Sequence, residues 1–276
     1  MCRRLAIRRS LAIASSTLLC PLLNAYSAPL TFSNANSITL NEDGYPPSPA
    51  APYPSTISVA GFPGAGVTKA TVTLHGLSHT FPSDISMLLV GPHGQSAILM
   101  AQTGGQSRYS VTNLTLTLDD DVVNSLPIYT GLTSGAFRPT DGYPVLGYAH
   151  FPYDFPAPAP PGNSNSVSSL GIFKNTDPNG QWSLFVVDDS TGDTGSISEG
   201  WSLSLAISPV LQVGRSERDV VIAWPRWATN CLLQSSAGLS VGSWSNVTNQ
   251  PSTNYGWLMV TNPASGPWTF FRLISR

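Results

Sequence analysis

The chain of 276 residues contains 10% charged and 41% apolar residues, 24 glycines and 24 prolines, and its formal net charge is −2. Because glycine and proline disfavour helix interiors and are spread along the whole length, this composition excludes long helices, coiled coils and helical solenoids. Seven Trp, nine Tyr and ten Phe supply enough apolar surface for a core, which excludes disorder. An all-β fold remains, with one large domain or two smaller ones.

The first 27 residues have the pattern of an export signal. Four arginines lie within 3–9, an apolar run follows over 11–23, and small residues precede the expected cleavage site before Ala28. The run has about 13 residues, against the roughly 20 that cross a bilayer as a helix, so a retained anchor is the weaker alternative. We expect a Sec-type signal peptide at 1–27 and a secreted, periplasmic or cell-surface protein; the twin-arginine route and a lipoprotein signal at Cys20 are further alternatives.

Removal of this leader changes the charge and the cysteine content. Four of the 13 basic residues leave, so nine remain against 15 acidic residues and the net charge becomes about −6. Two lysines and no basic stripe are not typical of a nucleic-acid-binding protein, so we expect no nucleic-acid partner and, after cleavage, no membrane span. Cys231 is then the one cysteine of the sequence, which excludes an internal disulfide.

Short runs in which apolar and polar residues alternate predict strands with one buried face. These runs are 71–74, 114–118 and 201–207. Two further runs, 85–90 and 182–187, are almost continuously apolar and predict strands that are covered on both faces. Proline-rich stretches at 44–54 and 152–161 exclude a helix or a central strand there. Turns rich in Gly, Pro and Asp separate the strands, which predicts a jelly-roll or galactose-binding-like β-sandwich over 28–208.

Residues 209–276 form a second β-rich block after Pro209. Its predicted strands are 220–224, 231–235, 257–261 and 268–273. About 67 residues are near the lower limit for independent folding, so we expect this small module to dock on the first domain or on a partner. Five of the seven Trp lie here, which favours core packing, with an exposed aromatic binding face as the alternative.

Two segments about 100 residues apart carry specific motifs. The first has a strand, a His-Thr pair, an Asp four residues after the Thr, a second strand and a Pro-x-Gly turn. The second has Gly-x-Trp, an Asp, a Gly and Trp-x-Leu. The motif residues are His79, Thr80, Asp84, Gly91, Pro92, Gly94, Gly180, Trp182, Asp188, Gly195 and Trp201. Over residues 53–207 the chain therefore resembles the P domain (Homo B domain) of proprotein convertases, in a divergent form of bacterial exported proteins.

This resemblance implies a jelly-roll sandwich that, in convertases, follows a subtilisin-like catalytic domain and stabilises it. Only about 25 residues separate the expected cleavage site from the P-like block, so we expect a free-standing, non-catalytic interaction or stabilising module. A protease-associated accessory role is an alternative. The tail from Leu211 to Leu273 is similar to a C-terminal β module on many exported verrucomicrobial proteins.

The motif residues also have structural interpretations. Asp84 precedes an apolar strand, where its carboxylate is expected to accept backbone N–H bonds of the turn, with metal ligation as the alternative. His79 is expected to form a hydrogen bond within the loop packing. Gly180 provides the tight turn before Trp182, whose ring is expected to fill one end of the sandwich, near Trp201 in the same sheet.

The sequence contains no hydrolase motif. It has no Gly-x-Ser-x-Gly elbow and no HExxH zinc pair, and Cys231 lies in an apolar run that favours a buried structural thiol. We therefore expect no enzyme and no catalytic residues. A Ser-His-Asp triad of distant residues stays an alternative, because triads are defined by geometry.

Acidic loops are the candidates for a ligand, and calcium is the possible cofactor. Calcium takes six to eight oxygen atoms from carboxylates, carbonyls and water, and a loop with three Asp supplies several. The candidate ligands are Asp188, Asp189, Asp193, Glu199, Asp119, Asp120 and Asp121. Calcium also occurs in some P domains, and solvated turn acids are the alternative interpretation.

A carbohydrate-binding module is the second functional hypothesis. Sugar rings pack on exposed aromatic side chains, and the candidates are Trp244, Trp257, Tyr148 and Tyr153. The partner is a cell-surface glycan under this hypothesis, and a protein under the first.

Overall fold

The structure is a computed structural model that describes residues 29–40, 46–105, 109–147, 155–162, 166–216, 219–263 and 269–275. The expected signal peptide at 1–27, and the candidates Tyr148 and Tyr153, lie outside these described residues. Within them the chain consists of strands with a few short 3-10 turns, so the all-β prediction is confirmed. No helix in the described ranges is long and apolar enough to cross a membrane.

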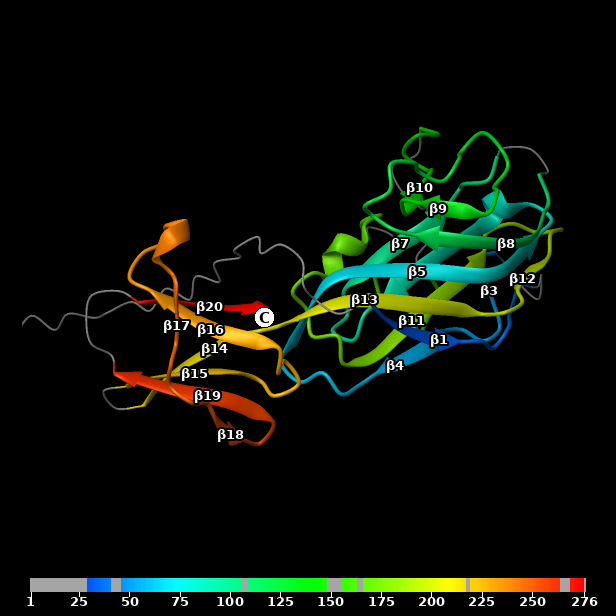
Figure 1. Cartoon of the computed structure of the whole chain (residues 1–276). Coiled ribbons are helices and arrows are strands. Elements are labelled where there is room, and N and C mark those ends of the chain that lie inside the picture. Colours follow the sequence, from blue (N-terminus) through cyan, green and yellow to red (C-terminus); the bar gives the residue numbers. More distant parts are fainter. Residues whose placement is uncertain are drawn as a thin grey trace, which may run out of the picture.

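Two sheets form the larger sandwich (Figure 1). The seven-stranded sheet contains β1 (Leu30–Asn34), β2 (Ile38–Leu40), β5 (Ala65–His79), β8 (Val111–Leu118), β9 (Gly135–Phe137), β12 (Gly195–Ile197) and β13 (Trp201–Pro209). The six-stranded sheet contains β3 (Ser48–Pro49), β4 (Ser55–Val59), β6 (Ile85–Val90), β7 (Ser96–Ala101), β10 (Thr140–Asp141) and β11 (Gly180–Asp188). Neighbours pair antiparallel, except that β9 and β10 run parallel to β8 and β7.

The core of this sandwich is a large cluster of buried side chains contributed by both sheets. Its largest members are Trp182 on β11 and Trp201 on β13, both fully buried. These strands belong to different sheets, so the expectation that the two Trp share one sheet is wrong. The ring N–H groups donate to Pro178 O and Ser55 Oγ, each at 3.0 Å, so burial leaves neither polar group unpaired.

The six-stranded sheet is covered on its outer face as well. All residues of β6, and Trp182 and 184–188 of β11, are buried, as their continuous apolar runs predict. Phe155 and Ala159 pack there in a second cluster that also contains Phe185. The Tyr53 hydroxyl donates to Pro156 O at 2.9 Å. The two proline-rich stretches of the sequence therefore meet on this face.

The tail forms two small sheets of its own (Figure 1). One has the order β14 (Gln212–Ser216), β15 (Asp219–Pro225), β19 (Trp257–Pro263) and β18 (Ser252–Asn254). The other has the order β17 (Ser245–Asn246), β16 (Cys231–Ser236) and β20 (Phe270–Ser275). A separate buried cluster joins them, with Ile222 and Trp224 from the first sheet and Leu233 and Leu273 from the second.

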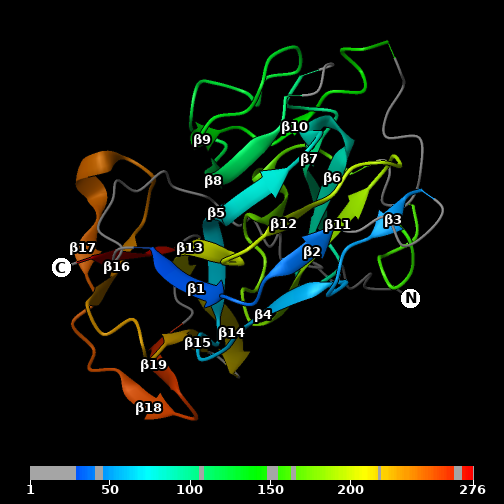
Figure 2. The same ribbon diagram turned by 90° about the vertical axis from the view of Figure 1, so that its right-hand side faces the viewer.

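The loop between β4 and β5 contacts this tail. The Trp227 ring N–H donates to Pro63 O at 3.0 Å, and the Trp227 ring stands edge-on to Phe62 at 6.4 Å. Gly64 has φ +69°, and a Cβ there would lie 2.4 Å from the Trp257 ring, so this close approach requires glycine. Trp227 and Trp257, two of the Trp residues concentrated in the tail, thus pack at the junction. Figure 2 shows the tail strands β16 to β19 at the left of the larger sandwich.

Candidate functional site

A group of buried and half-buried ionisable residues gathers at one end of the larger sandwich, where β5 and β11 end and β6 begins. We call it the carboxylate corner and define it as His79, Asp84, Asp188, Asp189 and Asp193. The strand register brings the segments together, because His79 pairs with Gly195 and Asp188 pairs with Ile85. The corner therefore contains one of the two predicted acidic loops together with His79 and Asp84, the two ionisable residues of the opening motif.

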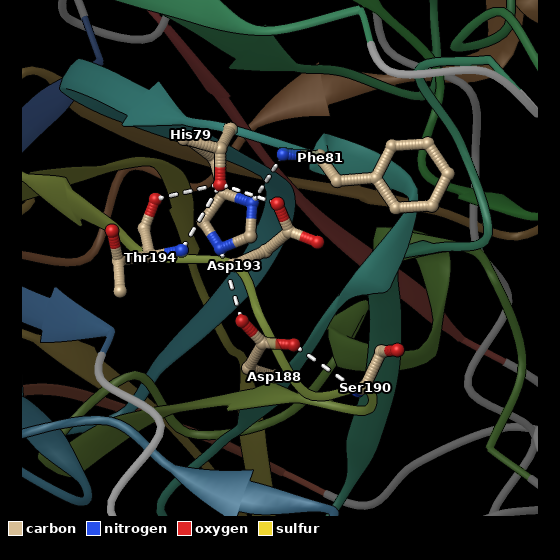
Figure 3. Close-up of polar contacts among 7 residues, drawn as sticks. His79, Phe81, Asp188, Ser190, Asp193 and Thr194 are labelled. Carbon is tan, nitrogen blue, oxygen red and sulfur yellow. Dashed lines mark hydrogen bonds and ion pairs between the residues drawn. The ribbon is translucent and has the colours of Figure 1, made fainter.

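His79 and Asp188 connect the two sheets inside the sandwich. The His79 Nε2 lies 3.1 Å from Asp188 Oδ2, with 0% and 1% of the two side chains exposed. His79 Nδ1 accepts the Phe81 backbone N–H at 3.1 Å, so Nε2 carries the proton and donates to the carboxylate (Figure 3). The Ser190 N–H donates to Asp188 Oδ1. Both ring nitrogens of His79 are thus engaged within the protein.

Gly195 allows this histidine to pack. A Cβ at Gly195 would lie 2.3 Å from His79 Cδ2 and 2.3 Å from Ser78 O, closer than any side chain tolerates. Next to it, the Thr80 hydroxyl donates to Asp193 Oδ1 at 2.7 Å and accepts the Thr194 N–H at 3.0 Å (Figure 3). These contacts fix the loop that precedes β12 against the end of β5.

Asp84 does not act as the predicted turn cap. Its backbone is paired, since its N–H donates to Phe81 O and its carbonyl accepts the Asp189 N–H. Its side chain, however, accepts no hydrogen bond among the described residues, and Oδ2 is buried without a partner. Burial, reinforced by the negative charges of Asp189, Asp188 and Asp193, raises the pKa of Asp84 to about 7.

Asp189 has uncharged partners only. The hydroxyls of Tyr143 and Ser86 donate to its Oδ2 at 2.9 and 3.3 Å. Burial raises the pKa of Asp189 to about 7 although these hydrogen bonds oppose the change, and the neighbouring Asp188 adds to it. No Lys or Arg of the described residues forms an ion pair with Asp84 or Asp189.

The other predicted acidic loop lies apart from this corner. Lys69 Nζ pairs with Asp119 Oδ2 at 2.8 Å and with Asp121 Oδ2 at 2.7 Å, on the exposed side of the sheet. Asp120 accepts the N–H groups of Leu170 and Gly171 and caps a 3-10 turn.

The predicted ligand Glu199 is exposed in the turn before β13. In the part of the chain that the structure describes, no three His, Cys, Asp or Glu side chains are already gathered to hold one metal ion. A single site that uses all the predicted acidic residues is therefore not formed.

The remaining candidate residues have structural partners. His75 Nε2 lies 2.9 Å from Ser202 Oγ, and within the described ranges no carboxylate contacts that histidine, so the pair lacks the third member of a triad. Cys231 is buried, and burial raises the pKa of its thiol.

The two described Trp candidates for sugar binding contact other parts of the protein. The Arg272 guanidinium lies over the Trp244 ring, 4.3 Å from its centre, and Trp257 packs on Gly64. Neither ring is therefore a free platform for a sugar.

Comparison with known proteins identifies no family for this chain. No family model matches the sequence, and no curated protein matches it. Among solved structures, a chain of the crystal structure of the Aeromonas sobria serine protease (ASP) and chaperone (ORF2) complex is similar, with 15% identity and a TM-score of 0.27. The match covers 66% of this chain and 28% of that chain. No function is transferred from a likeness at this level.

Proposed function

We propose that the protein is an exported, non-catalytic β-sandwich module that binds or stabilises another protein. The carboxylate corner supports a scaffold role, because the buried His79 uses both ring nitrogens in contacts that connect two sheets. A general base needs a nitrogen that is free to take a proton from a substrate. The arginine-rich, then apolar pattern of residues 3–23 supports export.

The surface also favours binding over catalysis. One hollow in the described surface is lined by Lys69, Asp121 and Lys174. Another is lined by Gln95, Ser96 and Ile172. Neither contains a histidine or a carboxylate of the corner. The resemblance to P domains leads to a more specific form of this proposal, in which the bound protein is a protease that the module stabilises. Only the sequence motifs support this more specific form.

A fluorophosphonate probe for active serines tests the non-catalytic part. We expect no labelling of the full chain, including at Ser202, whose hydroxyl contacts His75. Labelling of the natural chain that disappears in both Ser202→Ala and His75→Ala variants would show a catalytic serine and contradict the proposal.

Site-specific photo-crosslinking in the producing cells tests the binding part. A photoreactive amino acid at the exposed Tyr129 or Val213 samples both ends of the molecule. We expect one discrete protein adduct from at least one position, and none from the buried position Val72. Adducts absent from both exposed positions would contradict the proposal.

Carbohydrate binding is the second candidate, and two other tyrosines favour it. Tyr109 and Tyr129 are 45% and 62% exposed, and the Tyr109 ring packs against the backbone at Gly105 and Gly131. Sugar rings stack on such fixed aromatic faces. A glycan array tests this role: binding that is lost in Tyr129→Ala and kept in Tyr255→Ala, another exposed tyrosine, would replace the first proposal.

A further inference from the structure

The last strand of the tail has a neighbouring strand on one side only. β20 pairs with β16 over six consecutive residues without a bulge, and within the described residues no strand pairs with its other side (Figure 1). It is the longest of the described strands that pair on one side only. The edge of such a strand presents a row of N–H and C=O groups to which a further strand can add. β20 is therefore a template for one more strand.

The sequence of β20 does not protect this edge. Native proteins block exposed edges with proline, lysine, bulges or very short strands. β20 has the sequence FFRLIS, with no proline, glycine or lysine, and its pairing is regular. By contrast, the Asn34 amide of β1 donates to Thr56 O of β4 at 2.9 Å and links two edges of the larger sandwich, and the edge strand β14 contains Gly214 and Arg215. Among the described edges, β20 is thus the best suited to pairing.

The one charged side chain of β20 is turned away from this edge. The Arg272 Nε donates to Gln234 Oε1 on β16 at 2.9 Å, and the guanidinium lies over the Trp244 ring, 4.3 Å from its centre. The flanking side chains, Phe271 and Leu273, belong to the buried cluster between the two tail sheets. Arg272 therefore reaches back over β16 and does not cover the other side of β20.

We propose that two copies of the chain associate edge to edge through antiparallel β20 strands. Residues directly opposite in such a pair point to the same face, so the two-fold axis passes through one residue. An axis at Arg272 would place two guanidinium groups opposite each other, which is destabilising, and an axis at Phe271 would use less of the strand. An axis at Leu273 places Arg272 opposite Ile274 of the second copy. Charge therefore selects the register centred on Leu273.

The symmetry of this pairing gives a closed dimer. Each copy contributes one β20 edge and the two-fold axis uses both, so this edge offers no place for a third copy. The three-stranded sheets of the two tails would join into one continuous sheet. This inference concerns the tail alone, so it stands or fails independently of whether the module binds another protein.

Analytical ultracentrifugation of the full chain, at concentrations up to the millimolar range, tests this inference. We expect a monomer–dimer equilibrium in the natural chain. Ile274→Lys places a lysine opposite Arg272 of the second copy at two symmetric positions, so the dimer should weaken about tenfold or more. Ile274→Glu places an acid opposite the same arginine, so the dimer should be kept or strengthened, and high salt should remove the gain.

The two Ile274 variants control for each other. Both lose the same contact with Leu232, the opposite residue on β16, so a difference between them reports the charge at the interface and not the fold. Ile172→Lys, at an Ile that is 42% exposed on the larger sandwich, is the matched control and should keep the dimer. A natural chain that stays monomeric, association that continues beyond a dimer, or equal dimerisation of the two Ile274 variants would overturn the inference.

Discussion

Asp188 and Asp189 are neighbours in sequence but lie in opposite electrostatic environments. Asp188 points between the two sheets, where the His79 ring and the Ser190 N–H each donate to one of its oxygens. Asp189 lies with Tyr143 and Ser86 on the outer side of the six-stranded sheet, directly opposite Asp84. One step along a strand therefore separates a carboxylate that is fully paired from one that faces a second carboxylate.

The difference follows from the alternation of side chains along a strand. Asp188, the last residue of β11, meets the histidine at the end of β5, whereas Asp189, just after the strand, donates its N–H to Asp84 O in the 3-10 turn before β6. The inner pair is therefore expected to stabilise the fold, whereas Asp84 and Asp189, whose pKa values are raised to about 7, are expected to destabilise it when they lose their protons.

The largest effect is expected from breaking the inner pair. Asp188→Ala leaves the buried His79 N–H without an acceptor, and a hydrogen bond to a charged group is worth about 1.5–3 kcal/mol. Urea unfolding measures this loss, with Asp121→Ala as an exposed control that should cost less than about 1 kcal/mol. A loss below about 1 kcal/mol for Asp188→Ala would mean that the inner pair is not structural.

The pH dependence of stability should report the outer pair. The pKa values of Asp84 and Asp189 are raised to about 7 in the folded chain, so between about pH 4 and 7 the folded state binds more protons than the unfolded state. Stability in EDTA should therefore fall as pH rises through this window, by an amount on the order of 2–3 kcal/mol.

Asp84→Asn provides the comparison for this pH profile. Asp188, Asp193 and His79 also face the corner, so the contribution of the pair is taken from the difference between the variant and the natural chain. We expect a shallower profile for the variant in EDTA. Parallel profiles would show that Asp84 does not titrate in this window.

A smaller effect is expected at the junction between the larger sandwich and the tail. Trp227→Ala removes the hydrogen bond to Pro63 O and the edge contact with Phe62, which together are worth about 1–2 kcal/mol. Limited proteolysis should then cut near Val210 sooner than in the natural chain. An unchanged cleavage rate would mean that these contacts do not hold the tail.

The smallest effect is expected at the exposed acidic loop. Lys69 pairs with Asp119 and Asp121 where its own side chain is 36% exposed, and surface pairs of this kind contribute less than about 1 kcal/mol. Lys69→Met should change the urea midpoint only slightly, and high salt should remove the difference. A loss comparable with that of Asp188→Ala would reverse the ranking of the two acidic loops.

Strand periodicity predicted much of the fold. The alternation at 71–74, 114–118 and 201–207 corresponds to β5, β8 and β13, and the continuous apolar runs correspond to the two strands covered on both faces. The sheet assignment of Trp182 was not predictable, because alternation shows that a side chain is buried and not which sheet contains it. Short strands such as β12 escaped detection, because three residues carry too little periodicity.

The site was predicted only in part. The acidic loop at 188–193 stood out by composition, but the role of Asp84 depends on its register with Asp189, and register is a tertiary property. The interpretation of Asp84 as a turn cap was wrong because the turn satisfies its donors through the backbone. The available signal was one Asp directly before an almost continuously apolar strand and another Asp directly after a second such strand. Knowledge that these two strands pair would have brought the two residues together.

Strand β5 has a mechanical consequence. It runs without interruption from Ala65, directly after the loop that holds Trp227 and Trp257, to His79 at the carboxylate corner (Figure 1). Fifteen residues of strand span about 50 Å, and β13 and β8 brace it along much of this length. A force applied to the tail would therefore be transmitted along β5 to the other end of the sandwich, where the His79–Asp188 contact connects the two sheets.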